Sequence, residues 1–219
     1  MTRSDGRLCG HMLAVILAAT APAASALDLV REDVREFAGE MERKHGFERA
    51  WLEAVLADAA IQPRIIEMMS KPAEKVLPWH AYRRHFLTDE RIAAGVDFWT
   101  AHRDTLAEVE KSSGVAAHVI VGIIGAETFF GRITGRFRVV DALATLAFDY
   151  PPRAKYFRAE LEQYLLLARE EGFDTKTVLG SYAGAMGNGQ FMPRSYREWA
   201  VDGDGDGKRD LWGSWPDAI

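Results

Sequence analysis

One glutamate, Glu127, ends an apolar stretch in which isoleucines recur at helical spacing. Ile120, Ile123 and Ile124 precede it by seven, four and three residues, so a helix would place all four side chains on one face. Burial against a core or cleft disfavours the charged carboxylate and raises its pKa, and a glutamate raised to about 6 can donate a proton near neutral pH. The pattern indicates either a general acid for a glycosidic oxygen or a structural carboxylate satisfied by Arg132 or a backbone amide.

A second segment with chemical potential is the glycine-rich stretch 180–193. Its glycines at positions 180, 184, 187 and 189 allow positive φ or a close approach of the backbone to a ligand. From the residues alone, this stretch is either the wall of a cleft or a tight turn that buries Phe191 and Met192 in the core.

A third candidate is an acidic loop in which aspartates alternate with glycines. Asp202, Asp204 and Asp206 occupy positions one, three and five of a calcium-binding loop, and Gly207 occupies position six. Gly213 stands at position twelve, where such loops carry a glutamate. The loop therefore indicates a structural cation site, for calcium or for sodium or magnesium, or else a solvated acidic turn.

The elements that must position these residues are predicted to be helices. No segment shows sustained alternation of apolar and polar residues, so the chain is predicted to be mainly α. Lys71 to Ala81 lacks a helical stripe and is expected to be an extended connection, after which Thr88 caps a helix. The expected helical regions are 27–69 with two or three helices, 89–114 as one helix ended by Gly114, 116–130, and 152–171 with an apolar face at Phe157, Leu161, Tyr164, Leu165 and Ala168.

The composition is that of an ordinary globular protein. The 219 residues are 48% hydrophobic and 27% charged, with a formal net charge of −5. The chain has no long basic block, which argues against nucleic acid as a partner.

The N-terminus resembles an export signal. Arg3 and Arg7 precede an apolar run at 12–19, and the small residues 24–26 suit a cleavage site. The alternative, a membrane anchor, would need a run of about 20 apolar residues. Cys9 is the only cysteine and lies before the run, so the mature chain is expected to contain no disulfide.

Several motifs together resemble the membrane-bound lytic murein transglycosylase B family, which includes soluble members. The match runs from about Leu77 to the C-terminus and includes the Glu127 helix. Its most specific motifs are Asp-Ala-Leu-Ala-Thr-Leu at 141–146, Gly-Ala-Met-Gly at 184–187 and Gln-Phe-Met-Pro at 190–193, supported by Pro-Trp at 78–79 and Gly-Val-Asp-Phe-Trp at 95–99.

This resemblance implies a lysozyme-like catalytic core in which Glu127 is the sole acid and base. Glu127 would protonate the bond between N-acetylmuramic acid and N-acetylglucosamine and then accept the proton of the muramoyl C6 hydroxyl, giving a 1,6-anhydro product. No second carboxylate is needed where the N-acetyl group of the substrate stabilises the cation. Two alternatives stay open: a lysozyme-type hydrolase, and a calcium-stabilised peptidoglycan binder without activity.

The resemblance also implies roles for residues outside the Glu127 helix. Ser181 and Gln190 would contact peptidoglycan glycan strands, while Met186 and Phe191 would line the cleft. Asp217 and the Lys208 carbonyl would complete the Ca²⁺ site begun by Asp202, Asp204 and Asp206. The chain departs from the family pattern at Asn188, where a tyrosine is common, and at 129–130, where Phe-Phe replaces Arg-Trp.

The expected organisation follows from the signal and the resemblance. Residues 1–26 would be a signal peptide, 27–110 an N-terminal helical lobe and 111–219 the catalytic core. The mature protein is expected in the periplasm, without a stable membrane span. The family core continues with further helices, so a chain ending at Ile219 is expected to be a fragment or a shortened member.

Overall fold

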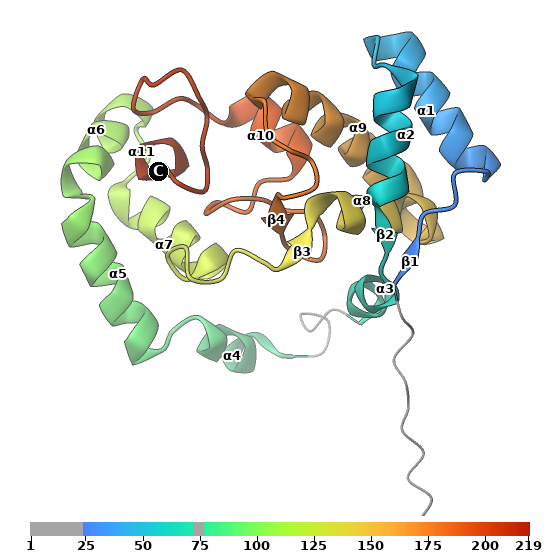
Figure 1. Cartoon of the computed structure of the whole chain (residues 1–219). Helices are drawn as coiled ribbons and strands as arrows, with labels where there is room; N and C mark the ends of the chain where they lie inside the picture. Colours follow the sequence, from blue (N-terminus) through green and yellow to red (C-terminus); the bar gives the residue numbers. More distant parts are fainter. Residues whose placement is uncertain (1–23, 72–76) are drawn as a thin grey trace, which may run out of the picture.

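The fold of the protein is given by a computed structural model that describes residues 24–71 and 77–219 (Figure 1). Residues 1–23 of the predicted signal peptide lie outside the described residues. The helices are α1 (Glu32–His45), α2 (Arg49–Asp58), α3 (Pro63–Ser70), α4 (Trp79–Tyr82), α5 (Asp89–Ala101), α6 (Arg103–Ser113), α7 (Ala117–Thr128), α8 (Val139–Phe148), α9 (Ala154–Glu171), α10 (Pro193–Trp199) and α11 (Trp215–Ala218), with 3₁₀ turns η2 (Arg83–His85) and η3 (Pro151–Arg153). The prediction of a mainly helical chain is confirmed.

Helix α8 forms the centre of the larger hydrophobic core. All of its residues are buried, as expected of a helix that is apolar on every side. Helices α1 to α3 from the start of the chain pack around it together with α9 and α10, and the predicted apolar face of α9 is buried in the same core. The first and the last thirds of the described chain therefore share one core (Figure 1).

Short antiparallel strand pairs join these layers. Strand β1 (Ser25–Ala26) pairs with β2 (Ala60–Ile61), and β3 (Phe137–Arg138) pairs with β4 (Leu179–Gly180). The backbone of β2 and of the residue after it is bonded to α8, because Ala60 N donates to Asp141 Oδ1 at 2.9 Å and Gln62 N donates to Thr145 Oγ1 at 2.9 Å. Buried polar side chains of α8 thus satisfy backbone donors of the N-terminal lobe.

Helices α5, α6 and α7 form an arch with a smaller core of its own. Phe98, Leu106, Val121 and Ile124 are buried in this core, and Trp215 packs against it. The predicted boundary between residues 110 and 111 stays a prediction, and both cores contain residues from each side of it.

The single helix expected over 89–114 is wrong in one respect. Thr88 caps α5 as predicted, since its Oγ1 accepts from Arg91 N at 3.2 Å, and Gly114 ends α6 with φ +75°. Between them the backbone leaves the helix at His102, with φ −114° and ψ +24°. The His102 ring lies 4.5 Å from the Phe98 ring and 5.4 Å from the Trp215 ring, so packing across the arch stabilises a bend that local propensity does not predict.

Within the part of the chain that the structure describes, no single helix is long and apolar enough to cross a membrane. The consecutive helices α6 and α7 meet the test of length and composition only as a pair, with a bend of 115° between them.

Candidate active site

Glu127 is the penultimate residue of α7. The buried face of this helix consists of Ala117, Val121, Ile124, Gly125 and Thr128. Glu127 lies on the other side of the helix and is exposed, as is Ile123 with 53% of its surface accessible. Of the two expected environments, core or cleft, the hydrophobic core is therefore excluded.

The carboxylate of Glu127 has no hydrogen bond or ion pair with any residue that the structure describes. Arg132, the expected structural partner, instead lies 3.7 Å from Glu90. Desolvation by neighbouring protein atoms raises the pKa of Glu127 above its ordinary value near 4.5. An accessible carboxyl group with a raised pKa and no partner can hold a proton and give it to a ligand.

The chain leaves α7 through a strained turn directly after Glu127. Phe129, Phe130 and Gly131 all have positive φ, at +52°, +57° and +79°. Each such conformation costs a residue with a side chain about 1 kcal/mol or more, so the surrounding contacts must impose it.

Two arginines and one threonine hold this turn. Arg91 donates to the carbonyl of Gly125, and the guanidinium groups of Arg91 and Arg132 lie 4.5 and 4.7 Å from the Phe129 ring centroid. Thr128 is fully buried; its Oγ1 donates to Asn188 O at 2.9 Å and accepts from the N–H of Gly131 at 3.0 Å. The strained backbone is thus anchored on both sides of the catalytic candidate.

Asn188 links the end of α7 to the C-terminal segment. It is buried, with 4% exposure, and it binds Leu211 O through its backbone N–H at 2.7 Å and Trp212 O through Nδ2 at 3.1 Å. At this departure from the family pattern, the backbone of Asn188 bonds Thr128 of α7 and Leu211, and its side chain bonds Trp212.

The glycine-rich stretch forms a compact turn whose side chains bind its own backbone. Ser181 Oγ accepts from Ala185 N at 3.0 Å and from Ala183 N at 3.2 Å. Gln190 has φ +52°, and its Nε2 donates to Thr134 O and Gly187 O at 3.1 Å each. No described residue bonds the Gln190 Oε1 atom, which remains available as an acceptor.

The expectation that Met186 lines the cleft is wrong, because the residue lies in the larger hydrophobic core. Its side chain is 0% exposed and belongs to the larger core, while Phe191 is half-buried against that core. The main chains of the two residues are hydrogen-bonded to each other at 2.8 Å in both directions. A glycan could therefore reach Phe191 but could not touch the Met186 side chain without a rearrangement of the core.

A close backbone contact joins the segment after Glu127 to the start of the glycine-rich turn. Gly135, in the connection after α7, has φ +101°, and a Cβ added there would lie 1.9 Å from the carbonyl oxygen of Gly180 in β4. Glycine is required by both the angle and the space. The strained turn after Glu127 and the glycine-rich turn after β4 are consequently held side by side.

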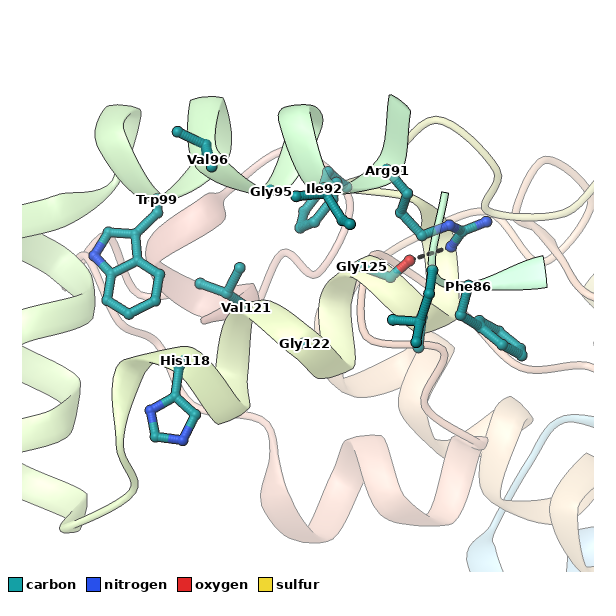
Figure 2. A pocket seen from close by; sticks show the side chains of 13 residues that line it. Phe86, Arg91, Ile92, Gly95, Val96, Trp99, His118, Val121, Gly122 and Gly125 are labelled. Atoms are coloured by element: carbon teal, nitrogen blue, oxygen red, sulfur yellow. Dashed lines mark hydrogen bonds between the residues drawn. The ribbon is translucent and has the colours of Figure 1, made fainter. Parts of the chain in front are cut away.

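A pocket of about 300 Å³ lies between α5 and α7 and is mostly apolar (Figure 2). Arg91, Gly95, Trp99 and His118 line it, together with Gly125, two residues before Glu127. Sequence reasoning missed this pocket and the anchoring role of Arg91. The one available signal was Gly125, which permits close packing: a Cβ there would lie 2.7 Å from the Phe130 ring.

The acidic loop brings together part of the expected ligand set. Carboxylate oxygens of Asp202, Asp204 and Asp217 lie within 4.8 Å of one another, and Asp217 is buried. Asp206 Oδ1 instead accepts from Lys208 N at 2.8 Å, within the loop. Three close carboxylates repel one another, and a hard cation with oxygen ligands would relieve that repulsion.

Comparisons with known proteins identify close relatives. A model of the transglycosylase SLT domain matches residues 30–219. Membrane-bound lytic murein transglycosylase B of Escherichia coli (strain K12) is 44% identical over 189 residues, which are 82% of this chain and 52% of that protein. The chain therefore spans about half the length of this curated relative.

Solved structures agree with the sequence comparison. Soluble lytic transglycosylase SltB1 from Pseudomonas aeruginosa is 53% identical, with a TM-score of 0.80 over 84% of this chain and 62% of that one. Escherichia coli lytic transglycosylase Slt35 in complex with calcium is 43% identical, with a TM-score of 0.82 over 89% and 62%. SltB3 from Pseudomonas aeruginosa, in complex with NAG-NAM-pentapeptide, is 32% identical, with a TM-score of 0.76 over 84% and 49%.

Proposed function

Because the chain belongs to the transglycosylase SLT domain family, we propose that it is a peptidoglycan lytic transglycosylase with Glu127 as its acid and base. The membership confirms the family predicted from the motifs, and the structural relatives confirm the mainly helical, lysozyme-like fold class. The observation that carries the proposal is the state of Glu127: accessible, without a partner among the described residues, and with a pKa raised by desolvation.

The reaction requires two proton transfers at one carboxyl group. Protonated Glu127 donates to the oxygen between N-acetylmuramic acid and N-acetylglucosamine as that bond breaks, and the N-acetyl group of the substrate stabilises the cation at C1. The resulting carboxylate then accepts the proton of the C6 hydroxyl while the C6 oxygen bonds to C1. The product is a 1,6-anhydromuramoyl end, no water is consumed, and Glu127 is protonated again.

The glycan would lie along the turn between β4 and α10. Two acceptor or donor groups on this turn remain available to a sugar: the hydroxyl hydrogen of Ser181 and Oε1 of Gln190. Phe191 would offer an apolar surface. Met186 is fully buried and is not part of the proposed glycan contact.

Digestion of purified murein sacculi tests this proposal. The parent protein is expected to release anhydromuramoyl products, identified by mass, and Glu127→Gln is expected to release none. Reducing-end products from the parent would show that water captures the intermediate, and the proposed activity would then be that of a hydrolase. Absence of any product from the folded parent protein would contradict the proposed activity.

A structural Ca²⁺ site is proposed at the acidic loop. Asp202, Asp204 and Asp217 would hold the ion, with Asp206 and the Lys208 carbonyl as the remaining predicted ligands. The calcium complex of the relative Slt35 supports the choice of ion. Calcium at about 100 times its Kd would stabilise the folded state by about 2.7 kcal/mol, so the Tm should rise on adding calcium and fall with a chelator. Asp202→Asn combined with Asp204→Asn should abolish that response.

Export to the periplasm is proposed from the N-terminal sequence and from the murein substrate of the relative. Cleavage after Ala26 would remove strand β1 but would keep Leu27, which is buried. The division into a lobe at 27–110 and a core at 111–219 is likewise a proposal. Mass analysis of the mature N-terminus would test the cleavage site.

A further inference from the structure

A second pocket lies where α1 turns into α2 and α9 ends. The turn between α1 and α2 lies on the other side of the molecule from α7 in Figure 1. Its volume is about 480 Å³. Helices α1 and α9 both end on a glycine in the left-handed region, Gly46 with φ +64° and Gly172 with φ +71°. The chain turns away sharply at both glycines, which leaves the space between the two helix ends open to the side chains of α2.

An aromatic platform forms one wall of this pocket. The indole of Trp51 is stacked on the ring of Phe47, with centroids 5.2 Å apart and planes 8° apart. Phe47 is buried at 6% exposure, whereas Trp51 is 37% exposed. The buried ring therefore fixes the orientation of an indole whose accessible surface lines the pocket.

The two charged side chains at the rim form no ion pair with the residues that the structure describes. The Arg169 guanidinium lies 4.2 Å from the Phe47 ring centroid and donates to His45 O at 2.8 Å. No described carboxylate lies within ion-pair distance of it. Glu48, on the α2 side of the pocket, is exposed, and its side chain has no hydrogen bond or ion pair with the described residues. A fixed aromatic face is thus flanked by an available cation and an available acceptor.

We infer that this pocket is a second glycan site, separate from Glu127, which binds an N-acetylated sugar of murein against Trp51. One face of such a ring consists of C–H groups, which pack on an aromatic surface, and its edge carries hydroxyl and amide donors suited to Glu48. Muramoyl units add a carboxylate, free or as part of a stem peptide, that complements Arg169. The inference rests on the proposed function for its choice of polymer.

Two separate contacts with one polymer would strengthen retention on it. Binding at the pocket makes the encounter of the same strand with Glu127 intramolecular, so overall affinity exceeds that of either site alone. The pocket should therefore affect binding to insoluble murein without changing the proton transfer at Glu127.

Cosedimentation with sacculi tests the inference in a Glu127→Gln background, in which the glycan stays intact. Trp51→Ala is expected to weaken binding by about three- to tenfold, the range that a lost aromatic contact produces. Trp199→Ala is the matched control, because this tryptophan is 72% exposed on α10 and outside the pocket. Arg169→Gln, at an exposed position, is a second variant that keeps the test valid if Trp51→Ala lowers the Tm. Unchanged binding by both pocket variants would overturn the inference.

A neutral tetramer of N-acetylglucosamine separates the sugar contact from the carboxylate contact. The indole N–H signal of Trp51, identified by its loss in Trp51→Ala, should shift on titration with the tetramer in NMR spectra. Arg169→Gln should weaken binding to sacculi while leaving the tetramer titration unchanged. Absence of a Trp51 shift would overturn the assignment to a sugar.

The two claims can fail separately. If the parent digests sacculi but binding does not depend on Trp51, the proposed activity is supported and the second glycan site is contradicted. If binding depends on Trp51 but no digestion products appear, the second glycan site is supported and the proposed catalysis is contradicted.

Discussion

The end of α7 and the contact between α9 and α10 each contain a glutamate whose pKa is raised by desolvation. Glu160 on α9 is 2% exposed, accepts from Arg194 N at 3.0 Å and lies 3.8 Å from the Arg194 guanidinium. Glu127 is accessible and has no partner in the described chain. A raised pKa therefore does not distinguish a structural carboxyl group from a catalytic one. The distinction comes from solvent access and from the absence of a partner.

The largest expected effect is the loss of activity in Glu127→Gln. Removal of a general acid costs about a hundred- to ten-thousand-fold in rate, and the amide cannot donate the required proton. Because Glu127 binds no described residue, the free energy of unfolding should change by no more than about 0.5 kcal/mol. Release of soluble muropeptides and urea denaturation measure the two quantities. A large loss of stability in Glu127→Gln would show that Glu127, like Glu160, has a structural role, and would contradict the proposed difference between the two residues.

The opposite result is expected for Glu160→Ala. This change leaves the partly buried backbone N–H of Arg194 without its acceptor, and the free energy of unfolding should fall by about 1–3 kcal/mol. Activity per folded molecule should stay within about twofold of the parent. Glu198→Ala, on the exposed side of α10, provides a matched control. A specific loss of activity in Glu160→Ala, without a loss of stability, would contradict a structural role.

Thr128→Val tests the anchor beside Glu127. Valine keeps the shape but removes the hydroxyl that binds Asn188 O and Gly131 N, at a cost of about 1 kcal/mol per neutral hydrogen bond. We expect a moderate loss of stability together with a fall in kcat, since the strained turn loses its fixed position. Thr100→Val, at an exposed position on α5, should change neither quantity.

The smallest expected effect is on the pH dependence of stability. Because the pKa values of Glu127 and Glu160 are raised in the folded state, the protonated form of each carboxyl group stabilises the fold. This contribution to the free energy of unfolding is fully present below the ordinary pKa near 4.5 and is lost as pH rises through the folded pKa. Glu127→Gln and Glu160→Gln should each flatten the decline of stability above pH 4.5. Urea denaturation in steps from pH 4 to pH 8 measures this decline, and an unchanged slope in both variants would contradict the raised pKa values.

The sequence predicted the helices well where one face is uniformly apolar. The face of α9 and the Thr88 cap are examples, because both depend on residues close together in the chain. The bend at His102 depends instead on Trp215, more than a hundred residues later, and nothing local signals it. The same limit applies to the site: spacing and motif predict Glu127 as the candidate acid, but the anchoring of its turn by Arg91 and Asn188 arises from packing.

Met186 illustrates a second limit. Motif resemblance transfers a position along the chain, but it does not say whether a side chain points to the cleft or to the core. Packing against residues distant in the chain decides this: Met186 is 0% exposed and belongs to the larger core, against which Phe191 packs. A glycine-rich segment without regular periodicity gives no sequence signal for that choice.

The shared core of α1 to α3 with α8 to α10 has a consequence for the order of folding. The hydrogen bonds from Ala60 to Asp141 and from Gln62 to Thr145 join residues 81 and 83 positions apart. Closing loops of this length costs chain entropy before any contact repays it, which slows folding. In a chain elongating from its N-terminus, α1 and α2 can contact each other, but the centre of their core is missing until α8 has been made. The earliest helices to be synthesised are therefore among the last to reach their final packing.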